Sequence, residues 1–245
     1  MAIDFFITKT NNSAGPMGPI GHIGPTGPSG LFSNNSIVIG IGASGARDSV
    51  SIGTNAGKTT QGALSIAIGK NAGQDSQTTS SIAIGNNAGN VLQSLNAIAI
   101  GTEAGKTLQG NAAVAIGSEA GTVSQGALSV AIGENAGNLS QGVAAVAIGK
   151  NAGISSQGTL SIAIGQSAGQ VGQGDNCVAI GGNAGQFYQP KNTNVIGNFT
   201  EFSGSLGGTD ATYINPIRNS NSALLPTDFK QLAWNETTKE IVWFG

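Results

Sequence analysis

Residues Ser65–Ser80 read SIAIGKNAGQDSQTTS, and the next sixteen residues, Ser81–Asn96, read SIAIGNNAGNVLQSLN. The pattern fills nine units of sixteen residues, which begin at residues 49, 65, 81, 97, 113, 129, 145, 161 and 177. A thirteen-residue unit precedes them at residue 36, and a degenerate unit follows at residue 193. Repeat positions are counted from the first residue of each unit. A period of sixteen is too short for a helical hairpin or a propeller blade, and it suits one turn of a β-solenoid.

The first five residues of a unit alternate between small and large side chains, which is the period of a strand with one buried face. We expect the large residues, such as Ile66 and Ile68, to point into the coil and stack, while Ser65 and Ala67 form a flat outer strip. A second strand is expected at about repeat positions 10–14. The isoleucines at repeat position 4 are therefore predicted to form a structural ladder: Ile52, Ile68, Ile84, Ile100, Ile116, Ile132, Ile148, Ile164 and Ile180.

Glycines at repeat positions 5 and 9, such as Gly69 and Gly73, are predicted to mark bends that need positive φ or close approach of the backbone. The alanine before the second glycine, such as Ala72, is expected to fill a narrow interior corner. Together with the strands, these bends predict an all-β solenoid built of sixteen-residue coils.

Glutamine at repeat position 13 is the one polar residue that every full unit shares. It could form a regular strip for a ligand, or a buried or half-buried row in which each amide bonds to the amides above and below. We favour the structural row, because such ladders recur in stacked β structures. Its members are Gln61, Gln77, Gln93, Gln109, Gln125, Gln141, Gln157, Gln173 and Gln189.

Residues 15–30 read GPMGPIGHIGPTGPSG, with glycine at every third position. Only glycine fits at the axis of a collagen triple helix, and proline favours its extended chain conformation, so we predict a short collagen-like stalk. A Pro/Gly-rich linker is the alternative. The triple helix needs three chains, and a strip of small residues would let protomers approach closely, so a homotrimer is expected. The collagen-like glycines are Gly15, Gly18, Gly21, Gly24, Gly27 and Gly30.

The chain thus divides into four predicted segments. Residues 1–14 are expected to form an N-terminal attachment segment, with a frayed terminus as the alternative. Residues 15–30 form the collagen-like stalk, residues 31–197 the repeat shaft, and residues 198–245 a C-terminal trimerisation cap. The cap holds more than half of the aromatic residues. Within it, Leu232–Phe244 (LAWNETTKEIVWF) predicts a β-hairpin that joins two apolar runs by a polar turn.

Composition argues against several classes of function. The net charge is −2 and no basic cluster occurs, so neither nucleic acid nor an anionic membrane is an expected partner. No secretory signal or membrane-spanning segment is recognised. Cys177 is the only cysteine and His22 the only histidine, and no catalytic triad, metal centre or cofactor site can be assigned. We therefore expect a protein that is not an enzyme and needs no cofactor.

The units SIAIGKNAG, AVAIGSEAG and SVAIGENAG resemble the head repeats of trimeric autotransporter adhesins such as YadA. That resemblance implies a left-handed parallel β-roll in a trimer, with Val and Ile inside. The chain also resembles the fibre-like proteins of large DNA viruses and some phages. The resemblance is carried by the Gly-X-Y triplets, by these repeats and by the tail Tyr213–Gly245, which contains NPIRN and TTKEI. That second resemblance implies a fibre or decoration on the virion surface.

From these features we expect a homotrimeric structural fibre on a virion surface, used for host attachment. Its N-terminus would bind the capsid or another virion protein, and a host receptor or glycan would contact the variable repeat positions 6, 7, 10, 11 and 15, or the cap. No membrane insertion is expected. The alternatives are a trimeric adhesin on a bacterial cell surface and a capsid-associated scaffold without a receptor.

Overall fold

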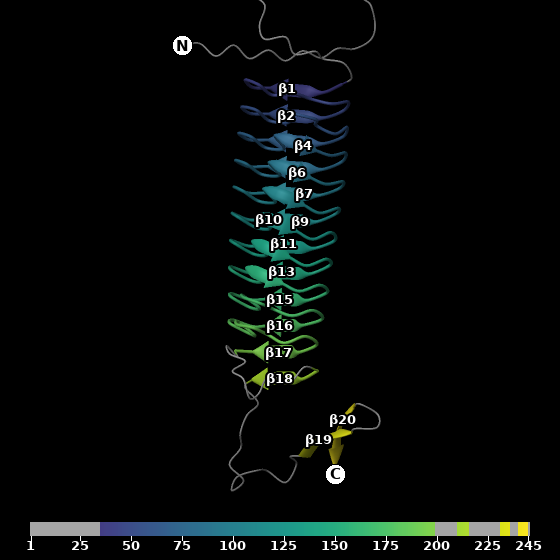
Figure 1. Ribbon diagram of the computed structural model, residues 1–245, viewed down its shortest axis with the longest axis vertical. Helices are drawn as coiled ribbons and strands as arrows, with labels where there is room; N and C mark the ends of the chain where they lie inside the picture. The colour runs from purple at the N-terminus through teal and green to yellow at the C-terminus, as the bar shows by residue number, and fades with distance from the viewer. Residues whose placement is uncertain (1–34, 199–209, 216–230, 236–239, 245) are drawn as a thin grey trace, which may run out of the picture. The chain divides into compact units, whose positions relative to one another are not determined.

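The computed structural model describes residues 35–198, 210–215, 231–235 and 240–244, and every regular element in these residues is a β-strand. The chain falls into two compact units, residues 1–215 and 216–245. In the first unit the repeats form coils that lie one above the next, as a parallel β-solenoid (Figure 1). The predicted attachment segment 1–14 and the collagen-like segment 15–30 lie outside the described residues.

The larger sheet of the solenoid has twelve parallel strands, one from each coil. In the full units the strands pair one repeat apart, so that Ile66 pairs with Ile82 and Ala67 with Ala83. The strands are β1 (Ile37–Ile39), β2 (Val50–Ile52), β3 (Ile66–Ile68), β5 (Ile82–Ile84), β7 (Ile98–Ile100), β9 (Val114–Ile116), β11 (Val130–Ile132), β13 (Val146–Ile148), β15 (Ile162–Ile164), β16 (Val178–Ile180), β17 (Asn194–Gly197) and β18 (Thr212–Asn215).

A smaller parallel sheet of six strands uses repeat positions 11–13, within the predicted range. Isolated bridges continue it by one coil before the first strand and by two after the last, through Thr59, Val171 and Phe187. Its strands are β4 (Asp75–Gln77), β6 (Val91–Gln93), β8 (Thr107–Gln109), β10 (Val123–Gln125), β12 (Leu139–Gln141) and β14 (Ser155–Gln157).

The two glycines of each unit lie at bends, as predicted. Gly117 has a φ of +127°, and a Cβ at that residue would lie 2.7 Å from the carbonyl oxygen of Gly133 in the next coil. Gly121 has a φ of +55° and lies against the side chain of Gln125. The first glycine therefore permits coils to stack closely, and the second leaves room for the interior glutamine.

At three further bends in the coil, residues other than glycine adopt the left-handed backbone conformation. The sequence analysis did not predict these bends. They fall at repeat positions 7, 12 and 16, where Asn71, Ser76 and Ser80 have φ values of 56°, 61° and 56°. Asparagine adopts this conformation more readily than most residues do, which explains its frequency at repeat position 7.

The expected orientation of the first strand was wrong. Ser65 and Ala67 are fully buried inside the coil, whereas Ile66 and Ile68 lie on the outer face and are half-buried. The two sheets are so close that the Nε2 of Gln77 reaches across and donates a hydrogen bond to the backbone oxygen of Ile66 at 2.8 Å. One glutamine side chain spans the interior, so isoleucine ladders have no room there. The core instead consists of stacked alanines, serines and glutamines.

Serine at repeat position 1 also has an interior role. The Oγ of Ser65 donates to the backbone oxygen of Gly62 at 2.6 Å, and Ser81 makes the same bond to Thr78 at 2.6 Å. Each bond closes the corner that leads into the next strand. Cys177 occupies the same repeat position and is fully buried, with its Sγ 2.8 Å from the backbone oxygen of Pro190.

The solenoid extends beyond residue 197, the predicted end of the shaft. Strand β18 pairs in parallel with β17, and Val195 pairs with Tyr213. These two residues replace the interior alanine of the repeats, and Tyr213 packs against the core. In the second unit, β19 (Gln231–Asn235) pairs antiparallel with β20 (Glu240–Phe244), which confirms the predicted hairpin.

Candidate interaction surfaces

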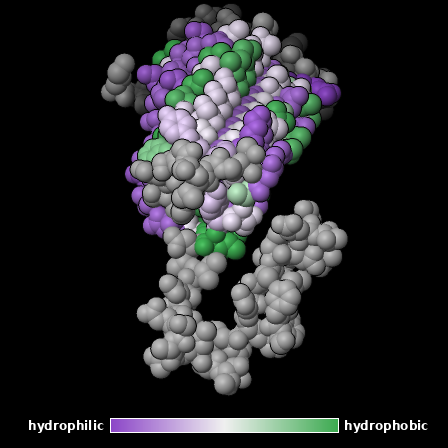
Figure 2. All heavy atoms as spheres, turned by 60° about the horizontal axis from the view of Figure 1, so that its bottom comes forward, coloured by the Kyte–Doolittle hydropathy of each residue, from purple (hydrophilic) through white to green (hydrophobic). Residues whose placement is uncertain are grey.

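The outer face of the large sheet carries a continuous apolar strip. It consists of the outward residues at repeat positions 2 and 4, and we call it the isoleucine–valine strip. The predicted ladder therefore exists as a row of paired residues, such as Ile100 with Ile116 and Ile132 with Ile148, but on the outside of the coil. Figure 2 shows hydrophobic residues gathered in bands along the solenoid, bordered by hydrophilic ones.

Within a single chain the isoleucine–valine strip is only partly covered. Ile116, Ile132 and Ile164 are 37%, 36% and 37% exposed, and the outward residues at repeat position 2 of the same strands, Val114, Val130 and Ile162, are half-buried. Scattered exposed apolar residues are ordinary on protein surfaces, but a contiguous apolar band bordered by polar residues is typical of an interface. The strip is therefore the strongest candidate for an interface with another polypeptide.

The glutamine row lies inside the coil, where an external ligand has no access. Gln109 is 1% exposed, and its Nε2 donates to the backbone oxygen of Ile98 at 2.7 Å and to the Oε1 of Gln125 at 3.1 Å. Its own Oε1 accepts a hydrogen bond from the Nε2 of Gln93 at 3.1 Å. Each such glutamine joins the two sheets and also joins neighbouring coils.

The row is interrupted at two places. The Oε1 atoms of Gln93 and Gln141 are buried and have no hydrogen-bond partner in the described residues. The two interruptions leave three runs, from Gln61 to Gln77, from Gln93 to Gln125 and from Gln141 to Gln189. The interior thus contains separate runs of aligned amides rather than one ladder along the whole solenoid.

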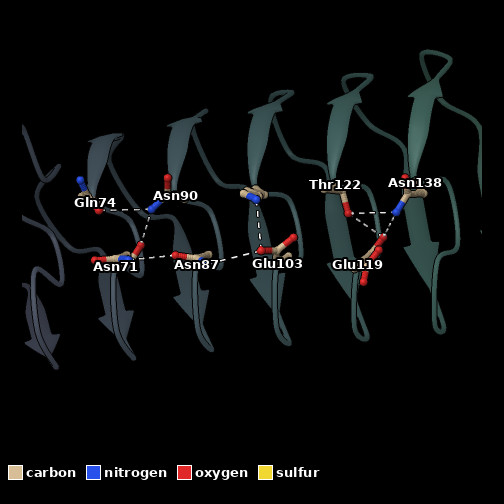
Figure 3. Close-up of polar contacts among 9 residues, drawn as sticks. Asn71, Gln74, Asn87, Asn90, Glu103, Glu119, Thr122 and Asn138 are labelled. Carbon is tan, nitrogen blue, oxygen red and sulfur yellow. Dashed lines mark hydrogen bonds and ion pairs between the residues drawn. The ribbon is translucent and has the colours of Figure 1, made fainter.

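One corner of the coil, formed by repeat positions 6, 7 and 10, is polar throughout most of its length, and we call it the amide corner. Along it the Nδ2 of Asn71 donates to the Oδ1 of Asn87 at 3.0 Å, and the Nδ2 of Asn87 donates to Glu103 at 3.4 Å (Figure 3). Asn55 begins the same chain with a 3.1 Å bond to Asn71.

A second contact ties the amide corner to the backbone of the preceding coil. The Nδ2 of Asn90 donates to the backbone oxygen of Asn71 at 2.8 Å, and Asn138 makes the equivalent bond to Glu119 at 3.0 Å (Figure 3). Asparagine at repeat position 7 in six of the nine full units was the sequence signal for this ladder, which the sequence analysis missed.

Charged side chains on the repeats are mostly paired across or within coils. Lys106 lies 3.1 Å from Glu103, and Lys150 lies 3.1 Å from Glu134. At repeat position 15, Asp175 accepts a hydrogen bond from the backbone N–H of Thr159 at 2.9 Å and pairs with Lys191 at 3.1 Å. The hydrogen bond from Thr159, and then Lys191, hold the pKa of Asp175 below its usual value.

The variable repeat positions expected to carry attachment residues lie on different sides of the coil. Positions 6, 7 and 10 form the amide corner, position 11 lies on the small sheet, and position 15 lies at the corner before the large sheet. The structure therefore does not bring the five positions together into one site.

In the described part of the chain, no group of three or more His, Cys, Asp or Glu residues is arranged to hold a metal ion. The same residues include no helix that is long and apolar enough to cross a bilayer. Comparison of the chain with protein-family models, with curated proteins and with solved structures finds no match.

Proposed function

We propose that this chain is the subunit of a homotrimeric structural fibre, displayed on a virion surface for attachment to a host. The observation that supports the trimer best is the isoleucine–valine strip, which runs along the outer face of the twelve-stranded sheet. Burial of this strip between protomers would remove its apolar surface from water, which is the main driving force of association.

A trimer also agrees with the predicted collagen-like segment, because that helix needs three chains wound together. The solenoid in this proposal acts as a spacer, whose length is set by the number of coils and a rise of about 4.8 Å for each coil. The position on a virion rests on the resemblance of the repeats and the tail to fibre-like viral proteins. Attachment to a receptor or glycan is the purpose that such a fibre would have.

The oligomeric state is tested by light scattering or sedimentation of the full chain, whose mass is 24.2 kDa. We expect three times this mass, and the double variant Ile116→Asp/Ile148→Asp should dissociate into folded monomers. The matched control is Thr102→Asp/Ser118→Asp, which adds the same charges at exposed residues of the amide corner and should leave the mass unchanged. A monomeric wild-type chain would refute the trimer.

The proposed location is tested separately by mass spectrometry of purified virus particles and by antibody labelling of intact ones. We expect the protein in the particles and the antibody on their surface. If the protein occurs instead in the outer membrane of a bacterium, or only inside particles, the proposal of an attachment fibre fails while the trimer can still stand.

A further inference from the structure

The corner that leads into the large sheet exposes large apolar side chains. At repeat positions 15 and 16 these are Leu64, Leu95, Leu128, Val143 and Leu160, which we call the leucine corner. Leu64, Leu128 and Leu160 are 55%, 63% and 60% exposed, well above the outward isoleucines of the neighbouring sheet. Only one interior residue separates each of these three from the isoleucine–valine strip, since Leu64 is followed by Ser65 and Ile66.

These leucines also have an unfavourable backbone. Leu64, Leu128 and Leu160 have φ values of 59°, 60° and 58°, a region that residues other than Gly, Asn and Asp rarely adopt. Other coils place asparagine at the same repeat position, and Asn96 has a φ of 56°. Asparagine would thus suit both the backbone and the solvent better than leucine does. Left-handed, exposed leucines also occur on the small sheet at Leu92 and Leu108. What distinguishes the leucine corner is that its exposed leucines directly adjoin the isoleucine–valine strip, so that the two form one larger apolar surface.

The two edges of the large sheet differ in kind. All its strands are parallel, so all of them begin at one edge of the sheet and end at the other. The leucine corner lies at the edge where the strands begin, and the amide corner lies at the edge where they end. Apart from Gly182, every residue at repeat positions 6 and 7 of the full units is polar. The leucine corner carries a large apolar residue in five of the nine full units. Thr79 and Ser80 make it polar in the unit that begins at residue 65, and Asp175, Asn176, Lys191 and Asn192 make it polar in the last two. Only one edge of the isoleucine–valine strip therefore continues as apolar surface.

We propose that the leucine corner of one protomer packs against the isoleucine–valine strip of a second copy of this chain. A three-fold axis requires a heterologous interface, in which two different surfaces of each protomer meet, and a sheet with one apolar edge and one polar edge provides two such surfaces. The isoleucine–valine strip repeats in every full unit, and the leucine corner carries its large apolar residues in the units that begin at residues 49, 81, 113, 129 and 145. Copies that lie parallel therefore bring these coils of one protomer level with the strip of the next. This inference rests on the trimer proposed above and specifies which edge is buried in it.

The test is the triple variant Leu64→Asn/Leu128→Asn/Leu160→Asn, compared with Leu92→Asn/Leu108→Asn. Leu92 and Leu108 are the matched control, because they are also left-handed and are 48% and 49% exposed, but lie on the small sheet. Dissociation is followed by dilution with light scattering or sedimentation, and folding by far-ultraviolet circular dichroism. We expect the triple variant to fold and to dissociate at a concentration at least about a hundredfold higher than the wild type, because three buried leucines are lost from each protomer.

The control variant should dissociate at the wild-type concentration. If the wild type is trimeric and the triple variant dissociates no more readily, the inference is wrong and the trimer stands. Equal weakening by the control variant also overturns it, since the small sheet would then belong to the interface. A monomeric wild type refutes the proposed trimer and this inference together.

Discussion

Truncation of Gln109 to alanine tests the interior glutamine row most directly. The side chain makes hydrogen bonds with the backbone oxygen of Ile98, with Gln125 and with Gln93, at 2.7, 3.1 and 3.1 Å. A net value of about 1 kcal/mol for each bond gives about 3 kcal/mol. The cavity left by the missing side-chain atoms adds about 1 kcal/mol, so we expect a loss of about 4 kcal/mol in the free energy of unfolding.

The assay is urea denaturation followed by circular dichroism, with Gln166→Ala as the control. Gln166 is exposed, so its truncation should change stability by less than about 0.5 kcal/mol. The double variant Gln93→Ala/Gln109→Ala should cost less than the sum of the single variants, because the two amides share a hydrogen bond. A loss below about 1 kcal/mol for Gln109→Ala would refute the view that the row holds the two sheets together.

Two further predictions concern single residues of the coil. Gly117→Ala should lower the free energy of unfolding, measured by urea denaturation, by at least about 2 kcal/mol, because the φ of Gly117 is positive and an added Cβ would meet the next coil. Gly182 has open space around it, so Gly182→Ala should leave the stability unchanged. Equal losses for the two variants would contradict this reasoning. Because the pKa of Asp175 is lowered on folding, the pairing of Asp175 with Lys191 should stabilise the protein above the unfolded pKa and lose its effect as pH falls through the folded pKa. The partly exposed pair is worth less than about 1 kcal/mol, so Asp175→Asn should lower the melting temperature slightly at pH 7. The difference from the wild type should fade as the pH falls and the carboxyl of Asp175 becomes protonated, and a difference that stays constant into acid would contradict the assignment.

The period of the sequence was enough to predict the solenoid, because every coil must present the same residue at the same level of the stack. The sixteen-residue spacing, Gly69 and Gly73 at the bends, and the buried corner at Ala72 all appear in the structure. Alternation shows only that the two faces of a strand differ, however, and not which face is inside. That choice depends on the distance between the sheets, and the bond from Gln77 to Ile66 shows how short it is.

Because the inner and outer faces of the first strand are the opposite of those expected, the candidate interface consists of different residues from those predicted. Small residues such as Ala67 were expected to let protomers approach, but they fill the core, and outward residues such as Ile68 take their place on the surface. The left-handed bends were missed because residues as different as Asn71 and Leu64 adopt them. In those corners the backbone follows from the coils stacked above and below more than from local preference.

The backbone hydrogen bonds between coils run along the direction of stacking, and the chain enters the solenoid at one end and leaves it at the other (Figure 1). Tension applied to the two ends of a chain therefore acts first on the end coils. A coil that detaches releases sixteen residues, which extend to about 55 Å and replace a rise of about 4.8 Å. A stretched solenoid would yield in equal steps of about 50 Å while the coils that remain keep their structure. The repeat that sets the length of the solenoid thus also sets the size of each such step.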